Sequence, residues 1–427
     1  MTKTTSQELY ERAVKVIPGG VTRPLRYFPP YPFYVEKAEG SRLFDFDGKT
    51  YSDFWMAHGA LLLGHMHPSI VEATRKQLEL GFHFGLCNEW EVKLAEQVTR
   101  LVPSVEMVAF SNSGNEANLH ALKLARAYTK RRKVGKFEGM FHGVLDPLFV
   151  GKSWPVREPE SAGQDPLSEK NTVLLADHNP EATYKAIRRR KLACVITELV
   201  VGGSAVPVDV EFVKGLREVC DETDTVLIFD EVITGFRLSP GGGQEAYGVR
   251  PDLTTFGKAV GGGEFPVGAV GGTREIMELM NHLKHPKRSE LVVRGGTYVG
   301  NPLVMRAGFE ATLLYQKAEF YPHINDLGNR LGTELERVVE ASNANAKVTG
   351  YGSMYKLHLL RKPVKKPSLK SLVTNSDHQA ELNYFKHLAS KGILAMIPSQ
   401  VHFYISLPHN QNEIDRVITA TEEFLRS

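Results

Sequence analysis

A lysine between a strand end and a run of glycines is the first residue of this sequence with an evident chemical use. Lys258 follows the strand-like stretch 252–256 and is flanked by Gly257 and by Gly261 to Gly263. Tightly turned backbone with little side-chain cover lets a lysine reach inward, where it can act as an amine nucleophile and form a Schiff base. The competing interpretation is an ordinary surface lysine, because most lysines are exposed.

Two further strand-like stretches end in acids. The apolar residues of 225–230 lead directly into Asp230 and Glu231, and the stretch 193–197 is followed by Glu198. An acid at the carboxyl end of a strand points into the crevice beyond the sheet rather than into the core. Its carboxylate can there hold a proton on a ring nitrogen or bind a metal. A helix cap or a salt bridge would account for the same residues.

A third candidate site follows the stretch 106–110. Ser113 can cap the helix that begins after it, and Gly114 and Asn115 leave room for an anion to approach. The free N–H groups and the positive dipole end of a helix suit a phosphate, although an ordinary N-cap is the alternative. An anion seat, an acid and an amine at neighbouring strand ends are together what pyridoxal phosphate requires.

The elements that position these residues follow an α/β pattern. Short, continuously apolar strands separated by helices favour a buried, mainly parallel sheet, and ligands bind beyond the carboxyl ends of such strands. We expect helices at 68–80, 90–101, 114–130, 180–190 and 210–222, and strands at 106–110, 193–197, 225–230, 252–256 and 267–270.

Both ends of the chain differ from this middle part. A short amphipathic helix ending at Pro18 is expected first, then β-structure over 27–55 with a hairpin turn at Asp47-Gly48. After about residue 310 a long helix leads into an α+β region. Its elements are a strand at 353–360, a helix at 377–391, strands at 393–396 and 402–407, and a helix at 412–425. We expect three parts: 1–62 as an N-terminal arm and part of a small domain, 63–310 as a large cofactor-binding domain, and 311–427 as the rest of the small domain.

The composition is that of an ordinary globular protein. Of the 427 residues, 52 are Lys or Arg and 49 are Asp or Glu, which gives a formal net charge of +3. That balance gives no reason to expect a nucleic-acid partner. No apolar run approaches the roughly 20 residues of a membrane span, and the N-terminus does not look like a signal peptide. Three dispersed cysteines without a CxxC pair favour reduced thiols and a cytoplasmic location.

Seven stretches of the sequence, in their order and spacing, resemble the class III aminotransferases, pyridoxal-phosphate enzymes of fold type I. They are PGGVTRPLR (18–26), LGHMHP (63–68), SNSGNEA (111–117), KFEGMFHG (136–143), LIFDEVITGFR (227–237), PDLTTFGKAVGGGEFPVGAVGG (251–272) and GTYVGNPLVMRAG (296–308). The resemblance is greatest to the glutamate-1-semialdehyde aminomutases and the β-amino-acid aminotransferases. It implies a large domain with a mainly parallel seven-stranded sheet flanked by helices, and a small α+β domain built from both chain ends.

The resemblance also implies roles for single residues around the cofactor. Lys258 would form the Schiff base and shuttle a proton between substrate and cofactor carbons, and Asp230 would keep the pyridine nitrogen protonated. Val232 would pack on one face of the ring and Phe141 on the other. Further candidates for the cofactor site are Ser113, Gly114, Asn115, His142 and Glu198, with His142 either donating a hydrogen bond or only packing.

Two implied roles concern substrate and partner. Thr297 would reach the phosphate held by a second subunit, so a homodimer with shared active sites is expected. Arg23 or Arg26 would bind a substrate carboxylate with its fork of donors. Arg26 matches the aminomutases and Arg23 the β-amino-acid enzymes, so the sequence carries both patterns.

Departures from the family pattern weigh against a simple aminomutase. Asn115 stands where threonine is usual in the phosphate loop, and Phe141 where tyrosine is frequent. Gly203 replaces an asparagine, and residues 398–402 lack an acid that the aminomutases carry there. The prediction is therefore aminomutase-like amino-group transfer by Lys258, with a β- or ω-amino acid: 2-oxo acid aminotransferase as the alternative. A racemase or epimerase is less favoured, because His142 is the one nearby candidate for a second base.

Other patterns have ordinary explanations. His65 and His67 form an HxH pair, but no carboxylate or cysteine accompanies them at ligand spacing, so no metal site is expected. The basic runs 130–133 and 188–191 lie near expected helix C-termini, where cations are favoured.

Overall fold

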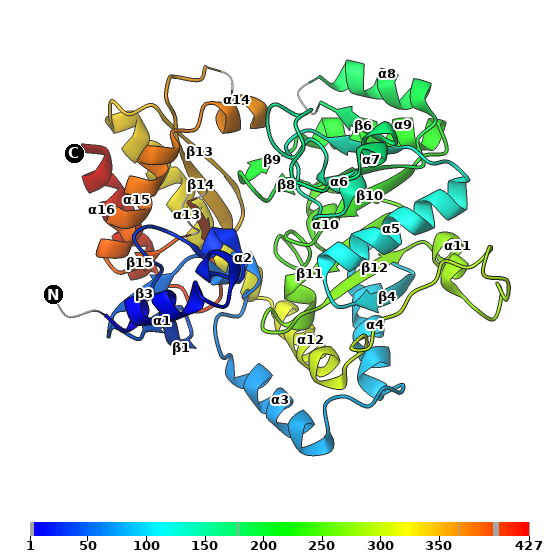
Figure 1. Ribbon diagram of the computed structural model, residues 1–427, viewed down its shortest axis with the longest axis horizontal. Coiled ribbons are helices and arrows are strands. Elements are labelled where there is room, and N and C mark those ends of the chain that lie inside the picture. The colour runs from blue at the N-terminus through cyan, green and yellow to red at the C-terminus, as the bar shows by residue number, and fades with distance from the viewer. Residues whose placement is uncertain (1–3, 177–178, 366, 396–400, 427) are drawn as a thin grey trace. The chain divides into compact units, whose positions relative to one another are not determined.

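The computed structural model describes residues 4–176, 179–365, 367–395 and 401–426 (Figure 1). The chain divides into two compact units. The larger consists of Pro68–Tyr321 and Ser368–Lys370, and the smaller of Met1–His67, Pro322–Pro367 and Ser371–Ser427. The chain passes between the units at 67/68 and 321/322, five and eleven residues after the boundaries expected at 62/63 and 310/311.

The larger unit is built around a seven-stranded sheet. The strand order is β4-β12-β11-β10-β7-β5-β6, and every neighbouring pair is parallel except those that β12 makes with β11 and β4. The mainly parallel seven-stranded sheet is as predicted. The strands are β4 (Met107–Ser111), β5 (Val134–Phe137), β6 (Thr172–Leu175), β7 (Cys194–Thr197), β10 (Val226–Asp230), β11 (Leu253–Gly257) and β12 (Gly268–Gly272).

Helices cover both faces of this sheet, which is why its strands are apolar throughout. Ile228 of β10 packs with α5 (Gly114–Thr129) on one face. Leu227 and Phe229 point to the other face, against α8 (Pro180–Arg190) and α9 (Val210–Glu222). A strand buried on both sides cannot alternate apolar with polar residues, so the continuous apolar run of β10 follows from its central position.

Helices at the edge of the larger unit, near its link to the rest of the chain, form a separate group. α12 (Pro302–Tyr315) packs against α3 (Pro68–Leu80) and α4 (Glu89–Leu101) (Figure 1). The shorter elements of this unit are α6 (Asp146–Phe149), α7 (Pro166–Lys170), α10 (Gly243–Tyr247), α11 (Arg274–Met277), η3 (Lys258–Gly261), η4 (Glu278–Met280), β8 (Val200–Val201) and β9 (Val206–Pro207).

The smaller unit combines two sheets with helices. One sheet has the order β1-β2-β3-β15 and the other β13-β14-β16, and the hairpin between β2 and β3 turns at Asp47-Gly48 as predicted. Its elements are α1 (Thr5–Ala13), η1 (Pro18–Gly20), η2 (Pro24–Arg26), β1 (Val35–Glu39), β2 (Arg42–Asp45), β3 (Thr50–Asp53), α2 (Met56–Gly59), α13 (Phe320–Ala341), β13 (Ala346–Tyr351), β14 (Met354–Leu359), α14 (Leu369–Thr374), α15 (His378–Ser390), β15 (Ile393–Leu394), β16 (His402–Tyr404) and α16 (Gln411–Arg426), of which α13 and α14 share residues with the larger unit.

Two expectations for the N-terminal segment are wrong. Residues 27–34 form no strand, because Pro29, Pro30 and Pro32 cannot donate to a sheet ladder. The first helix ends at Ala13 rather than at Pro18, and exposed Val14 lies beyond it.

The turn after β3 has an unusual backbone. Met56, Ala57 and His58 have φ angles of 48°, 51° and 62°, the left-handed region that side chains with a Cβ seldom adopt. Asp53 holds the entry to this turn, because its Oδ1 accepts hydrogen bonds from the N–H groups of Trp55 and Met56. Its Oδ2 lies 2.8 Å from His65 Nε2, so the first histidine of the HxH pair has an acid partner within the fold.

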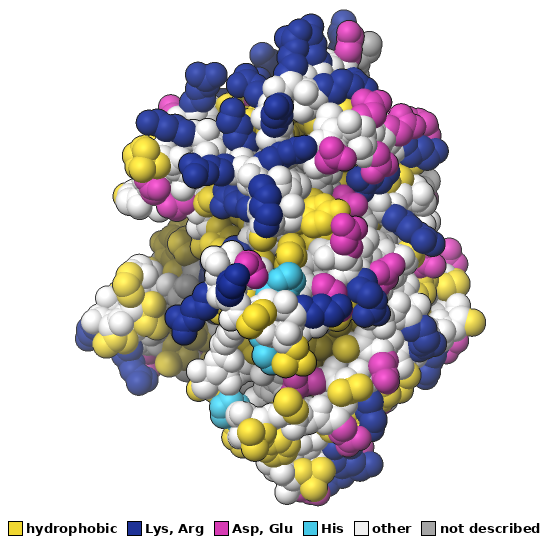
Figure 2. All heavy atoms as spheres, turned by 90° about the vertical axis from the view of Figure 1, so that its right-hand side faces the viewer, with side chains coloured by type: hydrophobic (Ala, Val, Ile, Leu, Met, Phe, Trp, Pro, Cys, Tyr) yellow, Lys and Arg dark blue, Asp and Glu magenta, His cyan; other side chains and the backbone are white. Residues whose placement is uncertain are grey.

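The two basic runs lie close together where α5 and α8 end. The N–H of Ala193 bonds to the Lys133 carbonyl, and Arg131 Nη1 donates to the carbonyls of Leu192 and Thr223. Figure 2 shows Lys and Arg side chains gathered over the upper part of one face, at the height of α8 in Figure 1. Arg131 thus connects the segments that lead into β7 and β10.

Among the described residues, no helix is long and apolar enough to span a bilayer.

Candidate active site

The three predicted chemical groups come together beyond the carboxyl ends of the strands of the large sheet. β10 ends in Asp230, β11 ends at Gly257 just before Lys258, and the loop after β4 leads through Ser113 into α5. The backbones approach closely here, because a Cβ on Gly257 would lie 3.6 Å from Gly114 Cα and 3.2 Å from Val232 Cγ1. A Cβ on Gly114 would lie 2.6 Å from Val232 Cγ2. The side chain of Val232 therefore lies between the start of α5 and the end of β11.

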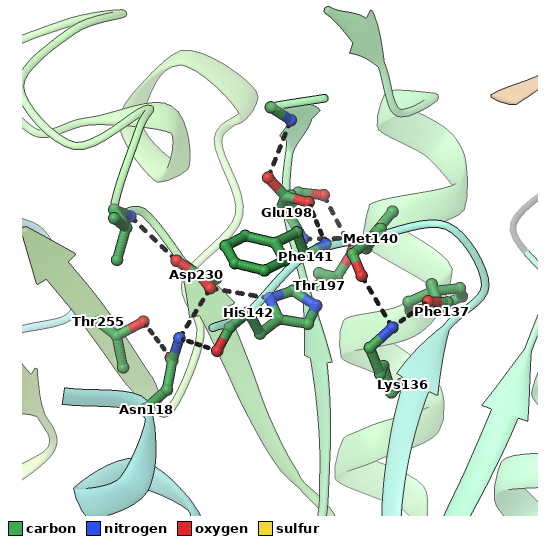
Figure 3. Close-up of polar contacts among 12 residues, drawn as sticks. Asn118, Lys136, Phe137, Met140, Phe141, His142, Thr197, Glu198, Asp230 and Thr255 are labelled. Carbon is green, nitrogen blue, oxygen red and sulfur yellow. Dashed lines mark hydrogen bonds and ion pairs between the residues drawn. The ribbon is translucent and has the colours of Figure 1, made fainter. Parts of the chain in front are cut away.

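Asp230 is a buried carboxylate with three hydrogen-bond donors (Figure 3). Its Oδ2 lies 2.8 Å from His142 Nδ1 and accepts a bond of 3.0 Å from Asn118 Nδ2, and its Oδ1 accepts the N–H of Val232 at 3.1 Å. Burial by itself raises the pKa of Asp230, but the His142 contact and the other two donors outweigh it and hold the pKa below the ordinary value. Asp230 is therefore charged at neutral pH.

His142 is fixed as the partner of Asp230. It lies in the loop after β5, its side chain is fully buried, and the N–H at Nδ1 points at the carboxylate. The backbone carbonyl of His142 accepts a bond from Asn118. Its Nε2 is buried and has no hydrogen-bond partner among the described residues. The sequence left its role open between donation and packing, and the structure shows donation to Asp230.

The start of α5 has the geometry of an anion seat. Ser113 Oγ accepts the N–H of Glu116, which confirms the predicted N-cap. The side chain of Asn115 turns away from the helix end, because its Oδ1 accepts the N–H of Val144 at 2.9 Å. Gly143 (φ +93°) packs so closely on this amide that a Cβ there would overlap it. Asn115 thus ties the loop carrying His142 to α5, and it offers an anion its backbone N–H rather than its side chain.

Glu198 holds the loop that carries His142 by accepting a backbone hydrogen bond from it. It is buried, and its two oxygens accept the N–H of Phe141 at 3.1 Å and the N–H of Gly202 at 2.9 Å. Burial raises the pKa of Glu198 above its ordinary value. With its backbone held this way, the side chain of Phe141 remains 40% exposed. Glu198 therefore supports Phe141 rather than standing alone as an acid at a strand end.

Lys258 begins a 3₁₀ turn directly after β11 with a left-handed backbone, φ +49°. The glycines after it have a packing role that the sequence did not reveal. A Cβ on Gly261 would meet Val267, and one on Gly262 would lie 3.3 Å from the Ala307 carbonyl of α12. The glycine run thus lets α12 pack against the turn that carries Lys258.

Three further predicted residues belong to other segments of the chain. Thr297 is exposed in the larger unit, in the segment between η4 and α12. Arg23 and Arg26 belong to the smaller unit. Residues 398–400 of the expected family motif lie outside the described residues.

Sequence reasoning missed Asn118, Thr255 and Lys136. Asn118 is a buried amide on the apolar face of α5, and that mismatch was the available signal. Its Oδ1 accepts the hydroxyl of Thr255 on β11 at 2.8 Å. Lys136 is fully buried on β5, and its Nζ donates to the carbonyls of Phe137 and Met140. β5 and β6 were not predicted as strands, since β5 contains this lysine and both strands have only four residues.

Comparison with known proteins identifies the family of this chain. The model of the class III aminotransferase family matches residues 26–425. The chain belongs to the class III aminotransferases. The predicted family, fold type and enzyme class are thereby confirmed, together with pyridoxal phosphate as the cofactor.

Named relatives within the class carry out more than one reaction. The glutamate-1-semialdehyde 2,1-aminomutase of Methanocaldococcus jannaschii is 39% identical over 426 residues, which are 98% of this chain and 97% of that protein. The solved omega-transaminase of Sphaerobacter thermophilus has a TM-score of 0.91 at 33% identity, covering 99% of this chain and 97% of its own. A β-phenylalanine aminotransferase from Variovorax paradoxus has a TM-score of 0.86 at 29% identity, covering 99% and 93%.

The burial of Lys136 should make the free energy of unfolding depend on pH. Burial lowers its pKa from 10.5 to about 8, so the unfolded chain binds more protons than the folded one between these values. Stability then rises with pH across this window, by up to roughly 3 kcal/mol. Lys136→Met should remove this rise in urea unfolding of the larger unit measured from pH 7.5 to 10.5. Exposed Lys185→Met is the control and should keep it. Parallel curves for Lys136→Met and wild type would contradict the assignment.

Proposed function

We propose that this enzyme moves an amino group on an amino-acid-type substrate with Lys258, Asp230 and the start of α5 as its working parts. The observation that carries the proposal is their convergence at one sheet edge, with Asp230 held charged by three donors. The reaction we favour is that of a glutamate-1-semialdehyde 2,1-aminomutase. Free, buried Cys194 and Cys220 suit the reducing cytoplasm, where we place the enzyme.

The residues present fit pyridoxal phosphate. A carboxylate has about four acceptor positions, and three are filled at Asp230, which leaves Oδ1 able to accept a ring N–H. The N–H groups of Gly114 and Asn115 come before the capped amide of Glu116 and can receive a phosphate together with the helix dipole. Partly exposed Val232 and Phe141 offer apolar surfaces for a flat ring.

Each group then has a definite task. Bound pyridoxal phosphate supplies an electron sink for the carbon next to the substrate nitrogen. Asp230 keeps a proton on the ring nitrogen, because the charged carboxylate is stabilised in place. The amine of Lys258 would hold the cofactor and would give it up to the substrate amine. Its Nζ would then be placed to move a proton at the substrate carbon, as a positioned base does.

Two reactions fit these tasks and differ in the route of the amino group. In the aminomutase reaction both ends of one molecule exchange the group, so no second substrate is needed. In the β- or ω-amino acid reaction a 2-oxo acid accepts it. The 39% identity to an aminomutase over nearly the whole chain supports the first. The likeness to an omega-transaminase and a β-phenylalanine aminotransferase, with Arg23 in the sequence, supports the second.

The deciding experiment loads the enzyme with the amine form of the cofactor and adds glutamate-1-semialdehyde without any oxo acid. We expect repeated turnover to 5-aminolevulinate, measured by chromatography of the product. Lys258→Ala should lose at least about 10²–10⁴-fold in rate, while exposed Lys123→Ala on α5 should match wild type. Turnover of β-phenylalanine only with an added 2-oxo acid would select the second reaction. Full activity of Lys258→Ala would refute the proposed mechanism.

Arg23 is the better candidate for the substrate carboxylate. Its Nη1 lies 3.1 Å from His58 Nε2, so the left-handed turn Met56–His58 supports the guanidinium. Partial burial and the nearby charge of Arg26 lower the pKa of Arg23, so a carboxylate would relieve the repulsion between two cations. Arg26 Nη1 is bonded to Thr22 Oγ1 instead.

Replacing Arg23 should weaken binding of carboxylate substrates alone. Arg23→Ala removes a charge-assisted pair worth about 1.5–3 kcal/mol, so kcat/KM for amino acids should fall roughly 10- to 100-fold. Amines without a carboxylate should react at the wild-type rate. Arg26→Ala is the matched comparison and should have a smaller effect. A larger loss in Arg26→Ala would move the carboxylate site to that residue.

We also propose a homodimer in which Thr297 serves the partner's cofactor. The segment after α3 exposes large apolar side chains, among them Phe82, Phe84 and Leu86, the last at 80%. The ring of His83 in this segment packs against Tyr298 in a tilted arrangement with ring centroids 4.9 Å apart, so the exposed segment adjoins Thr297. In Figure 2 hydrophobic side chains lie at the lower end of the face, at the height where α3 ends in Figure 1. Contiguous apolar surface of this kind marks an association site.

Charge on this surface should separate the subunits and loosen the cofactor. Phe84→Asp/Leu86→Asp should sediment as a monomer at concentrations where wild type is a dimer. It should also release pyridoxal phosphate faster on gel filtration, since Thr297 of the second subunit is lost. Leu167→Asp, at an exposed residue of α7, is the control. A double variant that remains dimeric would disprove this interface, and a monomer with undiminished cofactor binding would disprove the role of Thr297.

A further inference from the structure

One buried amide connects the parts of the site that the proposed function treats separately. Asn118 lies on α5, one turn after Gly114, and only 1% of it is exposed. Its Nδ2 donates to Asp230 Oδ2 and to the His142 carbonyl, both at 3.0 Å, and its Oδ1 accepts from Thr255 Oγ1 at 2.8 Å. Figure 3 shows this chain of contacts from Thr255 to His142.

The contacts of Asn118 fix which way its amide faces. An Asn side chain has two donor hydrogens and one acceptor oxygen. Both hydrogens are used, one on Asp230 and one on His142, and the hydroxyl of Thr255 holds the oxygen. A rotation of the amide by 180° would set its oxygen against two acceptors. The amide therefore has one stable orientation, with its N–H on the carboxylate.

The orientation of Asn118 determines how Asp230 is turned. Asp230 Oδ2 receives two donors, the His142 ring and the Asn118 amide, while Oδ1 receives the backbone N–H of Val232 alone. With the acceptor capacity of Oδ2 filled, Oδ1 is the oxygen that retains a free lone pair. We propose that Asn118, held by Thr255, is a positioning residue that turns Asp230 so that Oδ1 accepts the proton of the cofactor's ring nitrogen.

This inference rests on the proposed cofactor site and adds two residues to it. It also couples that site to Lys258, because Thr255 stands on β11 three residues before the lysine. Glu198 and His142 are titratable groups close to Asp230, and the charges of His142 and Asp230 both affect the pKa of Glu198. None of these can replace the N–H that Asn118 supplies, since Glu198 is engaged with Phe141 and Gly202.

The test compares substitutions at Asn118 in the holoenzyme and in cofactor-free enzyme. Asn118→Ala should weaken binding of pyridoxal phosphate roughly tenfold or more, as loss of a bond to a charged group does. It should also shift the pH at which the absorbance of the bound cofactor changes. Asn118→Asp should be as weak at neutral pH, because two carboxylates then face each other. It should recover at acid pH, where the introduced carboxyl group becomes protonated and can again donate a hydrogen bond to Asp230.

Thr255 gives a second pair of variants. Thr255→Val keeps the shape of the side chain but loses the hydroxyl, so it should shift the cofactor's pH titration in the same direction as Asn118→Ala, by less. Thr255→Ser keeps the hydroxyl and should restore wild-type behaviour. Leu122→Ala, also buried on α5, is the control for stability, and should lower the melting temperature without moving the titration.

The outcomes separate this inference from the proposed function. If wild type binds pyridoxal phosphate, Asp230→Asn loses it, and Asn118→Ala titrates as wild type, Asn118 is only structural and the inference is wrong. An Asn118→Asp variant without recovery at acid pH would also count against it. If wild type fails to bind pyridoxal phosphate at all, the proposed function itself fails.

Discussion

A carboxylate kept charged inside the protein is the constraint on which the rest of this structure depends. Burial of an unpaired ion costs far more than a folded domain can spare, so such a group either takes up a proton or gathers donors. Asp230 gathers three, from His142, Asn118 and the N–H of Val232. They come from a loop after β5, from α5 and from the turn after β10. Asp230 can thus remain charged inside the folded protein only when three separate segments have assembled around it.

The elements that meet this constraint also carry the remaining chemistry. α5 contributes Asn118 from its second turn and an anion seat from its first, so the two cannot move independently. β11 contributes Thr255 to the same hydrogen-bond chain and ends just before Lys258. The distances between the start of α5, Asp230 and Lys258 are therefore set by one helix and two neighbouring strands. Rigid elements hold such groups more accurately than loops do.

Sequence reasoning succeeded where chemistry and pattern coincided. The apolar run of β10 ending in Asp230, the N-cap at Ser113 and the position of Lys258 after β11 could all be read from residue order. It failed where a tertiary contact sets the meaning of a residue. β5 was not predicted because a charged residue such as Lys136 usually indicates an exposed position. Only the carbonyl partners of Lys136 explain why it is buried. The glycines after Lys258 are evident in the sequence, but residue order does not show that a Cβ on Gly261 would overlap Val267.

The cluster around Asp230 suits both candidate reactions equally, since each needs a protonated ring nitrogen and a lysine base. Selection between them must then come from groups that bind the far end of the substrate. The smaller unit contains backbone built for such precision, because Met56, Ala57 and His58 occupy left-handed conformations that cost about 1–2 kcal/mol each. Residues without glycine's freedom keep such angles only where neighbours enforce them, as Asp53 does through the N–H groups of Trp55 and Met56. His58 is the last residue of this left-handed turn, and its Nε2 is within hydrogen-bond distance of Arg23 Nη1. A lysine in place of Arg23 would lose the rigid fork that meets a carboxylate with two bonds, so we propose that the choice of substrate depends on this arginine and the turn that supports it.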